Sequence, residues 1–250
     1  MKRILRILIV ITLLFSLSAC SSQKNNISII MSDSGKVANS DKVYIENVAQ
    51  NSIDKISRYF GFKPTQNISI CIQDEFSYTD ETGVFLKKVL VQNRKAPITH
   101  EITHYLMNTT PSVNSGNAFF DEGIACMMEG LYGPKNTFLY FDSKKSEFKF
   151  GNVNQEIGKI KNLIKFESLI NNNDIFEAIP TSPTKEERIN RSNAYVEAGS
   201  FFLFVNDKYG KAKVKEFYYS QSILDFKNIF GKSLNDLESE WVSYLKNHHL

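Results

Sequence analysis

The sequence predicts an α+β protein with a small N-terminal sheet, a functional helix beside that sheet and a mostly helical C-terminal lobe. Short apolar runs that alternate with polar residues occur in the first hundred positions, and Ile68–Ile72 is the clearest predicted strand. From about Gln155 onward apolar residues recur at helical spacing instead. Breaks between these predicted helices are expected around 180–183, at Gly210 and at Gly231.

The first twenty residues carry the signature of an exported lipoprotein. Residues 1–6 are basic, an apolar run follows from Ile7 to Phe15, and small residues precede Cys20. The apolar run is too short for a spanning helix, so 1–19 are predicted to be a signal peptide. The segment resembles a bacterial lipobox, which implies lipid on Cys20 and anchoring on the extracytoplasmic side of the cell membrane. The alternative is a simple secreted protein with a cysteine at this position.

The charge and the cysteine content of the chain indicate which partners and which covalent cross-links to expect. Three of the 30 basic residues and none of the 27 acidic ones lie in residues 1–19, so the remaining chain is close to neutral. No basic stripe is left, and nucleic acid is therefore not an expected partner. Beyond Cys20, only Cys71 and Cys126 remain, and they could either form a disulfide or stay as two buried thiols.

The composition divides the rest of the chain into a tether and a single domain. Residues 20–40 are rich in Ser, Asn and Lys and are predicted to form a flexible tether. Residues 41–250 are predicted to form the domain, with an N-lobe over about 41–133 and a C-lobe over about 134–250.

Three further elements are expected within this domain. A helix is expected over 41–60, ended by Gly61. A hairpin is expected from Val84–Leu86 and Val89–Val91, with Val89–Gln92 as a strand bordering the functional site. Aromatic residues alternate over 137–150 and indicate a second hairpin.

The segment His100-Glu101-Ile102-Thr103-His104 places two of the four histidines of the chain four residues apart. On a helix these two side chains share one face, so both imidazoles can bind one metal ion. Glu101 lies beside them and is suited to act as a general base. The opposite face is apolar and is expected to be buried; it consists of Ile98, Ile102, Tyr105 and Leu106. The alternative is a pair of ordinary surface histidines.

A catalytic zinc site needs a third protein ligand, and the sequence favours a carboxylate. The remaining histidines, His248 and His249, lie at the very end of the chain. Glu122 follows His104 after seventeen intervening residues, enough to cross a loop and start a second helix over about 119–131. That helix is expected to bury one apolar face, made of Phe120, Ile124, Met127, Met128 and Leu131. Glu129 shares the face of Glu122, where a solvated position is favoured over contact with the site.

The motif H-E-I-T-H, followed by F-F-D-E-G-I-A at this distance, resembles the gluzincin zinc metallopeptidases of the peptidase-MA-like group. The resemblance implies a zincin-like fold and one Zn²⁺ per chain, bound by His100, His104 and Glu122, with Glu101 as general base. Residues 194–202 are similar to a downstream helix of that group. The resemblance also implies a Tyr or His from the C-terminal part as donor to the developing oxyanion, and Tyr195 is the candidate. The alternative is a tyrosine packed in the core. The G-x-M-E-N segment of gluzincin aminopeptidases is absent, so aminopeptidase activity is not expected.

The expected function is hydrolysis of a peptide or protein substrate by a membrane-anchored zinc metallopeptidase. Two alternative functions involve binding and no hydrolysis. The first is a catalytically inactive peptidase-like lipoprotein that binds a peptide or protein partner. The second is a solute-binding lipoprotein, for which the set of His100, Glu101, His104 and Glu122 has no purpose.

Overall fold

The computed structural model describes residues 27–30, 37–62, 67–110, 116–142, 144–160, 162–176 and 183–248. The predicted signal peptide, the predicted lipidation site Cys20 and most of the break expected at 180–183 lie outside the described residues. Within the described part of the chain, no helix is long and apolar enough to cross a membrane.

Four strands form a mixed sheet in the order β1-β2-β4-β3. They are β1 (Ile27–Ile30), β2 (Ile68–Gln73), β3 (Tyr78–Asp80) and β4 (Gly83–Lys87). β1, β2 and β4 run parallel, and β3 pairs antiparallel with β4 at the edge of the sheet. Ile68, Ile70 and Ile72 are buried while the residues between them are partly exposed, so one face of the sheet turns toward the core.

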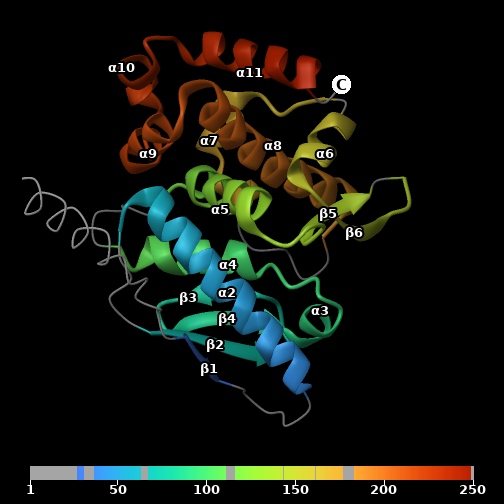
Figure 1. Ribbon diagram of the computed structural model, residues 1–250. Coiled ribbons are helices and arrows are strands. Elements are labelled where there is room, and N and C mark those ends of the chain that lie inside the picture. Colours follow the sequence, from blue (N-terminus) through green and yellow to red (C-terminus); the bar gives the residue numbers. More distant parts are fainter. Residues whose placement is uncertain are drawn as a thin grey trace, which may run out of the picture.

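Helix α2 (Asn39–Phe60) is the crossover that joins the parallel strands β1 and β2 (Figure 1). Ile45 and Ile53 lie on its buried side and are fully inaccessible to solvent. Gly61 ends the helix with a φ of 82°, a left-handed conformation that glycine adopts without a steric cost. The helix predicted over 41–60 and its end at Gly61 are thus confirmed.

Part of the predicted tether over 20–40 belongs to the sheet. Ile27–Ile30 pairs in parallel with β2, with Ile27 opposite Ile68 and Ile30 opposite Cys71. The pairing joins segments that are separated in sequence by the whole of α2. Local composition does not reveal such a contact, because a parallel strand finds its partner only through a crossover connection.

The strand predicted at Val89–Gln92 is wrong. These residues belong to α3 (Lys88–Gln92), a short helix in which Val91 is buried. β4 already has β2 on one side and β3 on the other, so a strand following β4 has no free edge of β4 to pair with. The edge strand beside the functional helix is β3, and Thr79 of β3 donates a hydrogen bond to that helix.

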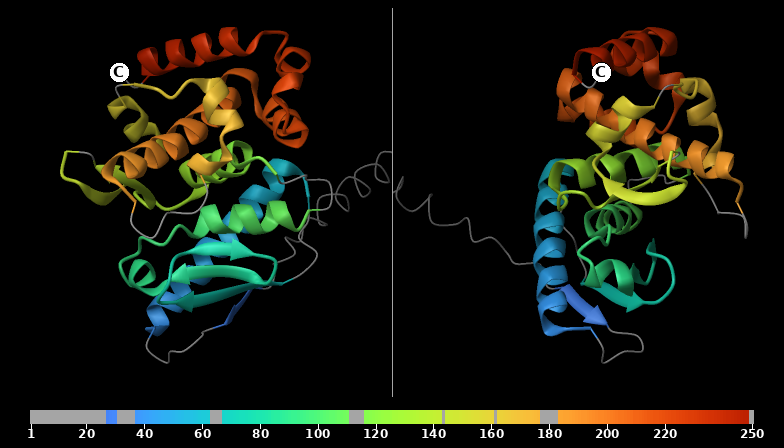
Figure 2. Two further views of the ribbon diagram at one scale, coloured as in Figure 1. Left: turned by 180° about the vertical axis from the view of Figure 1, so that it is seen from behind. Right: turned by 90° about the vertical axis from the view of Figure 1, so that its right-hand side faces the viewer.

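The predicted functional helix is α4 (Ile98–Asn108), and the predicted second helix is α5 (Ala118–Tyr132). Figure 2 shows α4 lying on the sheet, with α5 packed on α4 and α8 (Lys185–Tyr209) beyond α5. The apolar faces expected for the two predicted helices are buried, with one exception. Leu131 is 37% exposed because it lies in the last turn of α5.

The C-terminal lobe is mostly helical, as predicted. Its elements are the hairpin β5 (Phe138–Asp142) and β6 (Glu147–Gly151), then α6 (Val153–Glu156), α7 (Phe166–Asn171), α8, α9 (Lys211–Ser220), α10 (Phe226–Phe230) and α11 (Leu234–His248). The hairpin predicted over 137–150 and the breaks at Gly210 and Gly231 are confirmed. α11 lies on the far side of this lobe from α4 (Figure 1).

A cluster of aromatic rings forms the core of the C-terminal lobe. Phe166 and Phe201 pack with ring centroids 4.3 Å apart, and Phe120 and Phe217 with centroids 4.7 Å apart, both pairs with tilted rings. Trp241 of α11 is fully buried and donates a 3.3 Å hydrogen bond to Ser200 of α8. Each buried ring removes a large apolar area from water, so this cluster fixes α8 against α5 and α11.

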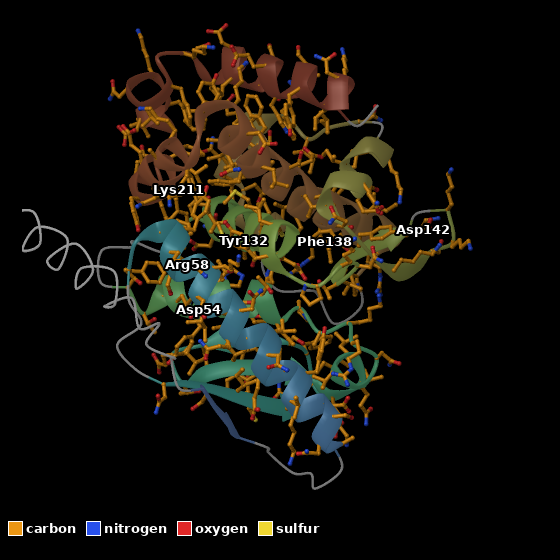
Figure 3. The ribbon with its side chains drawn as sticks, in the orientation of Figure 1. Asp54, Arg58, Tyr132, Phe138, Asp142 and Lys211 are labelled. Atoms are coloured by element: carbon orange, nitrogen blue, oxygen red, sulfur yellow. The ribbon has the colours of Figure 1, made fainter. Side chains whose placement is uncertain are left out.

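The C-terminal end of α2 contacts the C-terminal helices directly. The Tyr59 hydroxyl donates to Asn206 of α8 at 2.7 Å. Lys211 of α9 donates to the backbone carbonyl of Arg58 at 3.3 Å and lies over the Tyr59 ring. Figure 3 shows Arg58, Lys211 and Tyr132 gathered where these helices meet. The sheet and the helical lobe are therefore joined by these contacts as well as through α5, which packs on both α4 and α8.

Candidate metal centre

Helix α4 carries both histidines on the face opposite its buried apolar side. Ile98 and Ile102 on the opposite face are completely buried, which fixes the rotation of the helix about its axis. The side chains of His100 and His104 are 12% and 17% exposed, and their Nε2 atoms lie 3.1 Å apart. Two imidazoles on one face, predicted from their four-residue spacing, therefore converge on one point.

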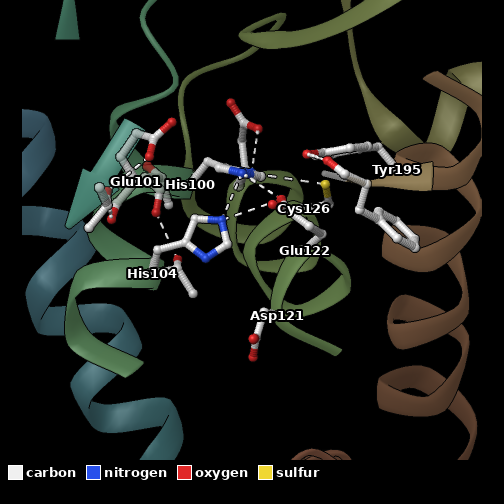
Figure 4. A network of polar contacts seen from close by, with 12 residues as sticks. His100, Glu101, His104, Asp121, Glu122, Cys126 and Tyr195 are labelled. Carbon is white, nitrogen blue, oxygen red and sulfur yellow. Dashed lines mark hydrogen bonds and ion pairs between the residues drawn. The ribbon is translucent and has the colours of Figure 1, made fainter. Parts of the chain in front are cut away.

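Helix α5 brings a carboxylate to the same point (Figure 4). The Glu122 Oε2 atom lies 3.1 Å from Nε2 of His100 and 3.3 Å from Nε2 of His104. The start of α5 is fixed by Asn117, whose side-chain oxygen accepts the Phe119 backbone N–H and caps the helix. His100, His104 and Glu122 together form a cluster whose ligand atoms lie within 4.8 Å of one another.

The geometry of these three residues suits a zinc ion. Ligand atoms about 2.0–2.1 Å from a tetrahedral ion are roughly 3.4 Å apart, close to the three observed separations of 3.1, 3.1 and 3.3 Å. Glu122 Oε2 is buried, and no hydrogen bond of good geometry reaches it from the described residues. The three ligand atoms converge on a common position. Two imidazoles and one carboxylate are a donor set that catalytic zinc sites use.

Glu101 lies beside this cluster and is largely shielded from water, with 6% of its surface exposed. The Thr79 hydroxyl, from the edge strand β3, lies 2.9 Å from Glu101 Oε2 and 2.9 Å from the Glu101 backbone oxygen. Burial raises the pKa of Glu101, although the charges of the two histidines oppose that shift. A carboxylate whose pKa moves toward neutrality is suited to accept and release a proton.

Two more groups surround the other nitrogen of His100. The Cys126 sulfur lies 3.9 Å and the Glu129 Oε2 atom 3.8 Å from His100 Nδ1. Glu129 was expected to be solvated, but it is only 5% exposed, because the turn before β5 covers it. A metal-binding histidine usually has a polar partner at its second nitrogen. The Glu129 carboxylate, 3.8 Å from Nδ1, lies beyond hydrogen-bond distance and acts on His100 as a nearby charge. Its helical spacing from Glu122 was visible in the sequence, but its burial was not.

Cys71 and Cys126 do not form a disulfide with each other. Cys71 is partly exposed, and Cys126 is fully buried between α4 and α8. Burial raises the pKa of Cys126 to about 11, so the group is a neutral thiol at physiological pH. That state agrees with the sequence argument that Glu122, and not Cys126, completes the ligand set.

Asp121, the neighbour of Glu122, is held by the C-terminal lobe. Its Oδ1 atom accepts hydrogen bonds from the Tyr218 hydroxyl at 3.1 Å and from Gln221 at 3.2 Å. Both donors come from the end of α9, so these bonds tie the first turn of α5 to that helix. Nothing in the local sequence pattern predicts this contact, because the residues it joins lie about one hundred positions apart.

Tyr195 of α8 lies next to the cluster, as Figure 4 shows. Its ring centroid is 6.5 Å from that of His100, and its hydroxyl donates to the Phe176 backbone oxygen at 3.2 Å. Burial raises the pKa of Tyr195, and the negative charge of Glu122 adds to the shift, so the hydroxyl stays protonated. The structure thus brings together all five residues that the sequence singled out for the centre; the remaining predicted site, Cys20, lies outside the described residues.

Two glycines allow α8 to approach α5 this closely. A Cβ on Gly199 would lie 2.6 Å from the Cys126 Cβ atom, and a Cβ on Gly123 would lie 2.5 Å from the Phe202 ring. Real Cβ atoms do not make such short contacts, so the helix crossing requires glycine at both positions. The close crossing is what places Tyr195 at the centre.

Comparison of the chain with models of known protein families finds no match, and comparison with curated proteins finds none either. The interpretation of the centre therefore rests on its own residues and their geometry.

Proposed function

We propose that the protein is a zinc-dependent metallopeptidase with a zincin-like fold. The observation that carries the proposal is the convergence of His100, His104 and Glu122 within 3.1–3.3 Å of one another, beside the buried carboxylate of Glu101. Three ligands leave one position of a tetrahedral ion open, which is the arrangement of a catalytic and not of a structural site.

The residues of the chain divide the chemistry among them. When bound, a zinc ion supplies an activated water molecule and polarises the scissile carbonyl group. Glu101 takes the proton of that water and passes it to the leaving amine. The charge of Glu129, 3.8 Å from Nδ1 of His100, favours the ring orientation in which Nε2 faces the metal position.

Tyr195 donates a hydrogen bond to the carbonyl oxygen of the substrate as negative charge develops on it. Its hydroxyl is protonated over the whole physiological range, because its pKa is raised. To act as this donor, the hydroxyl exchanges its present acceptor, the Phe176 backbone oxygen, for the substrate oxygen.

The substrate is a peptide or protein outside the cell membrane. The support for this location is the signal-peptide pattern over 1–19 and the lipobox-like residues before Cys20, which imply a lipid anchor. Replacing Cys20 by alanine should release the protein from the membrane fraction of the producing cells, and retention of that variant in the membrane would contradict the anchor.

The effect of Glu101→Gln on hydrolysis tests the enzymatic proposal. Activity is measured with fluorescein-labelled casein and with a mixture of quenched-fluorescent random peptides, using zinc-loaded protein. Glu101→Gln should abolish turnover and keep the zinc content of the wild type, because the amide cannot accept the proton but leaves the ligands intact. Glu46→Gln, the same change on the exposed side of α2, is the matched control and should behave as the wild type.

Two outcomes would contradict the proposal. An unchanged rate in Glu101→Gln would exclude Glu101 as the base. A zinc-loaded wild type that binds casein peptides without cleaving any would instead favour the catalytically inactive, peptide-binding alternative.

A further inference from the structure

Thr79 connects the edge strand of the sheet to the candidate general base. In β3 the side chains alternate, so that Tyr78 turns outward and stacks on Phe85 of β4 with centroids 4.5 Å apart. Thr79 consequently turns inward, toward α4. Its hydroxyl lies 2.9 Å from both the side-chain Oε2 and the backbone oxygen of Glu101.

The hydroxyl of Thr79 has one proton to donate. Both possible acceptors, the Oε2 atom and the backbone oxygen, belong to Glu101. A carboxylate is the stronger acceptor, because hydrogen bonds to charged groups are shorter and stronger than those to neutral ones. Among the described residues, Thr79 is the one group whose hydrogen bond reaches the Glu101 carboxylate. With 6% of Glu101 exposed, bulk water is poorly placed to replace that donor.

We propose that Thr79 is a positioning residue, which holds the Glu101 carboxylate by one oxygen and so leaves the other oriented toward the metal position. This role rests on the proposed function of Glu101 as general base. General-base catalysis needs the accepting oxygen within hydrogen-bond reach of the proton it removes, so a freely rotating carboxylate would be productive only part of the time.

The contact also links the base to the edge of the sheet. β3 pairs with β4 on one side only, with Thr79 opposite Val84. A slip of β3 by one residue would turn Thr79 outward, because successive side chains point to opposite faces. The register of the β3–β4 hairpin therefore sets the orientation of Glu101. That register is stabilised by Asp80, whose Oδ1 atom accepts from Thr82 and Gly83 in the turn.

Three variants test the role of Thr79. Thr79→Val keeps the shape and β-branching of the side chain but removes the donor, whereas Thr79→Ser keeps the donor. Thr110→Val makes the same change just after the end of α4, where the hydroxyl donates to the Leu106 backbone oxygen, and serves as the matched control. Each variant is loaded with zinc and assayed with fluorescein-labelled casein for kcat and KM, and crystal structures of the wild type and Thr79→Val are determined.

The expected result is a fall in kcat of about 10–100-fold for Thr79→Val with little change in KM or zinc content. Thr79→Ser should recover most of the rate, and Thr110→Val should match the wild type. In the crystal, the Glu101 carboxylate should occupy one orientation in the wild type and leave it, or divide between two, in Thr79→Val.

An unaltered kcat in Thr79→Val, or an equal loss in Thr79→Ser, would overturn the proposal. If the wild type cleaves nothing, the proposed function fails and the crystal structures decide this proposal alone. The same single orientation of Glu101 in both crystals would then refute the role of Thr79, and a changed orientation in the variant would support it.

Discussion

Replacing Gly199 by alanine should destabilise the protein by forcing α8 away from α5. The new Cβ would lie 2.6 Å from the Cys126 Cβ atom, while the two Val153 methyl groups at 3.4 and 3.5 Å close the way out. Restoring an ordinary contact requires a shift of roughly 1 Å in a packed interface, a kind of overpacking that costs about 1–3 kcal/mol. Alanine regains about 0.5–1 kcal/mol of helix propensity, so with both terms near the middle of their ranges the free energy of unfolding should fall by about 1–2 kcal/mol.

Gly130→Ala is the matched control for this prediction. Gly130 lies on the same helix pair, but its added Cβ would meet Leu203 at 3.8 Å, an ordinary contact. Thermal unfolding of zinc-free protein should show a Tm lowered by roughly 2–8 °C for Gly199→Ala and unchanged or raised for Gly130→Ala. A Gly199→Ala variant as stable as the wild type, or equal losses in both variants, would refute the argument that the close crossing requires glycine.

Three further predictions concern single side chains near or beyond the centre. Glu129→Gln should weaken zinc binding about 10–100-fold in competition with a chelator, because the ring of His100 loses its charged partner; an unchanged affinity would show that Glu129 does not hold that ring. Tyr195→Phe should lower kcat roughly 100-fold or more with little change in KM, and a wild-type kcat would remove Tyr195 from the mechanism. Burial raises the pKa of Glu197 to about 8 from an ordinary value of 4.5, so folding favours its protonated form. Wild-type stability should therefore fall as pH rises from about 5 to 8 and then level off, while Glu197→Gln, whose amide can still accept the Ile164 N–H, should lose that dependence in urea unfolding.

Local periodicity was sufficient to predict the two helices that carry the centre. The apolar stripe that includes Ile98 and Ile102 fixed the direction in which His100 and His104 point, and both stripe residues are fully buried. The turn-forming residues between the helices similarly indicated where α5 begins. Helix faces are encoded by nearby residues, which is why the side chains that share one face could be predicted from the sequence.

Contacts between segments far apart in the sequence could not be predicted from local periodicity. The pairing of Ile27–Ile30 with β2, and the helical state of Val89–Gln92, both depend on which strand edges are already occupied. Glu129 was placed on the correct helix face, but its burial depends on the turn that precedes β5, after the end of α5. The hydrogen bond from Thr79 to Glu101 likewise arises from a strand that the sequence pattern did not predict.

The metal content of the purified soluble form, residues 21–250, tests the central claim most directly. Inductively coupled plasma mass spectrometry should find about one zinc ion per chain in the wild type. The zinc should be almost completely lost in His100→Ala and in Glu122→Ala. His248→Ala, at the end of α11, is the control and should keep the metal. A wild type that holds no metal as purified, and takes up none when zinc is added, would contradict the three-ligand centre and the peptidase proposed from it.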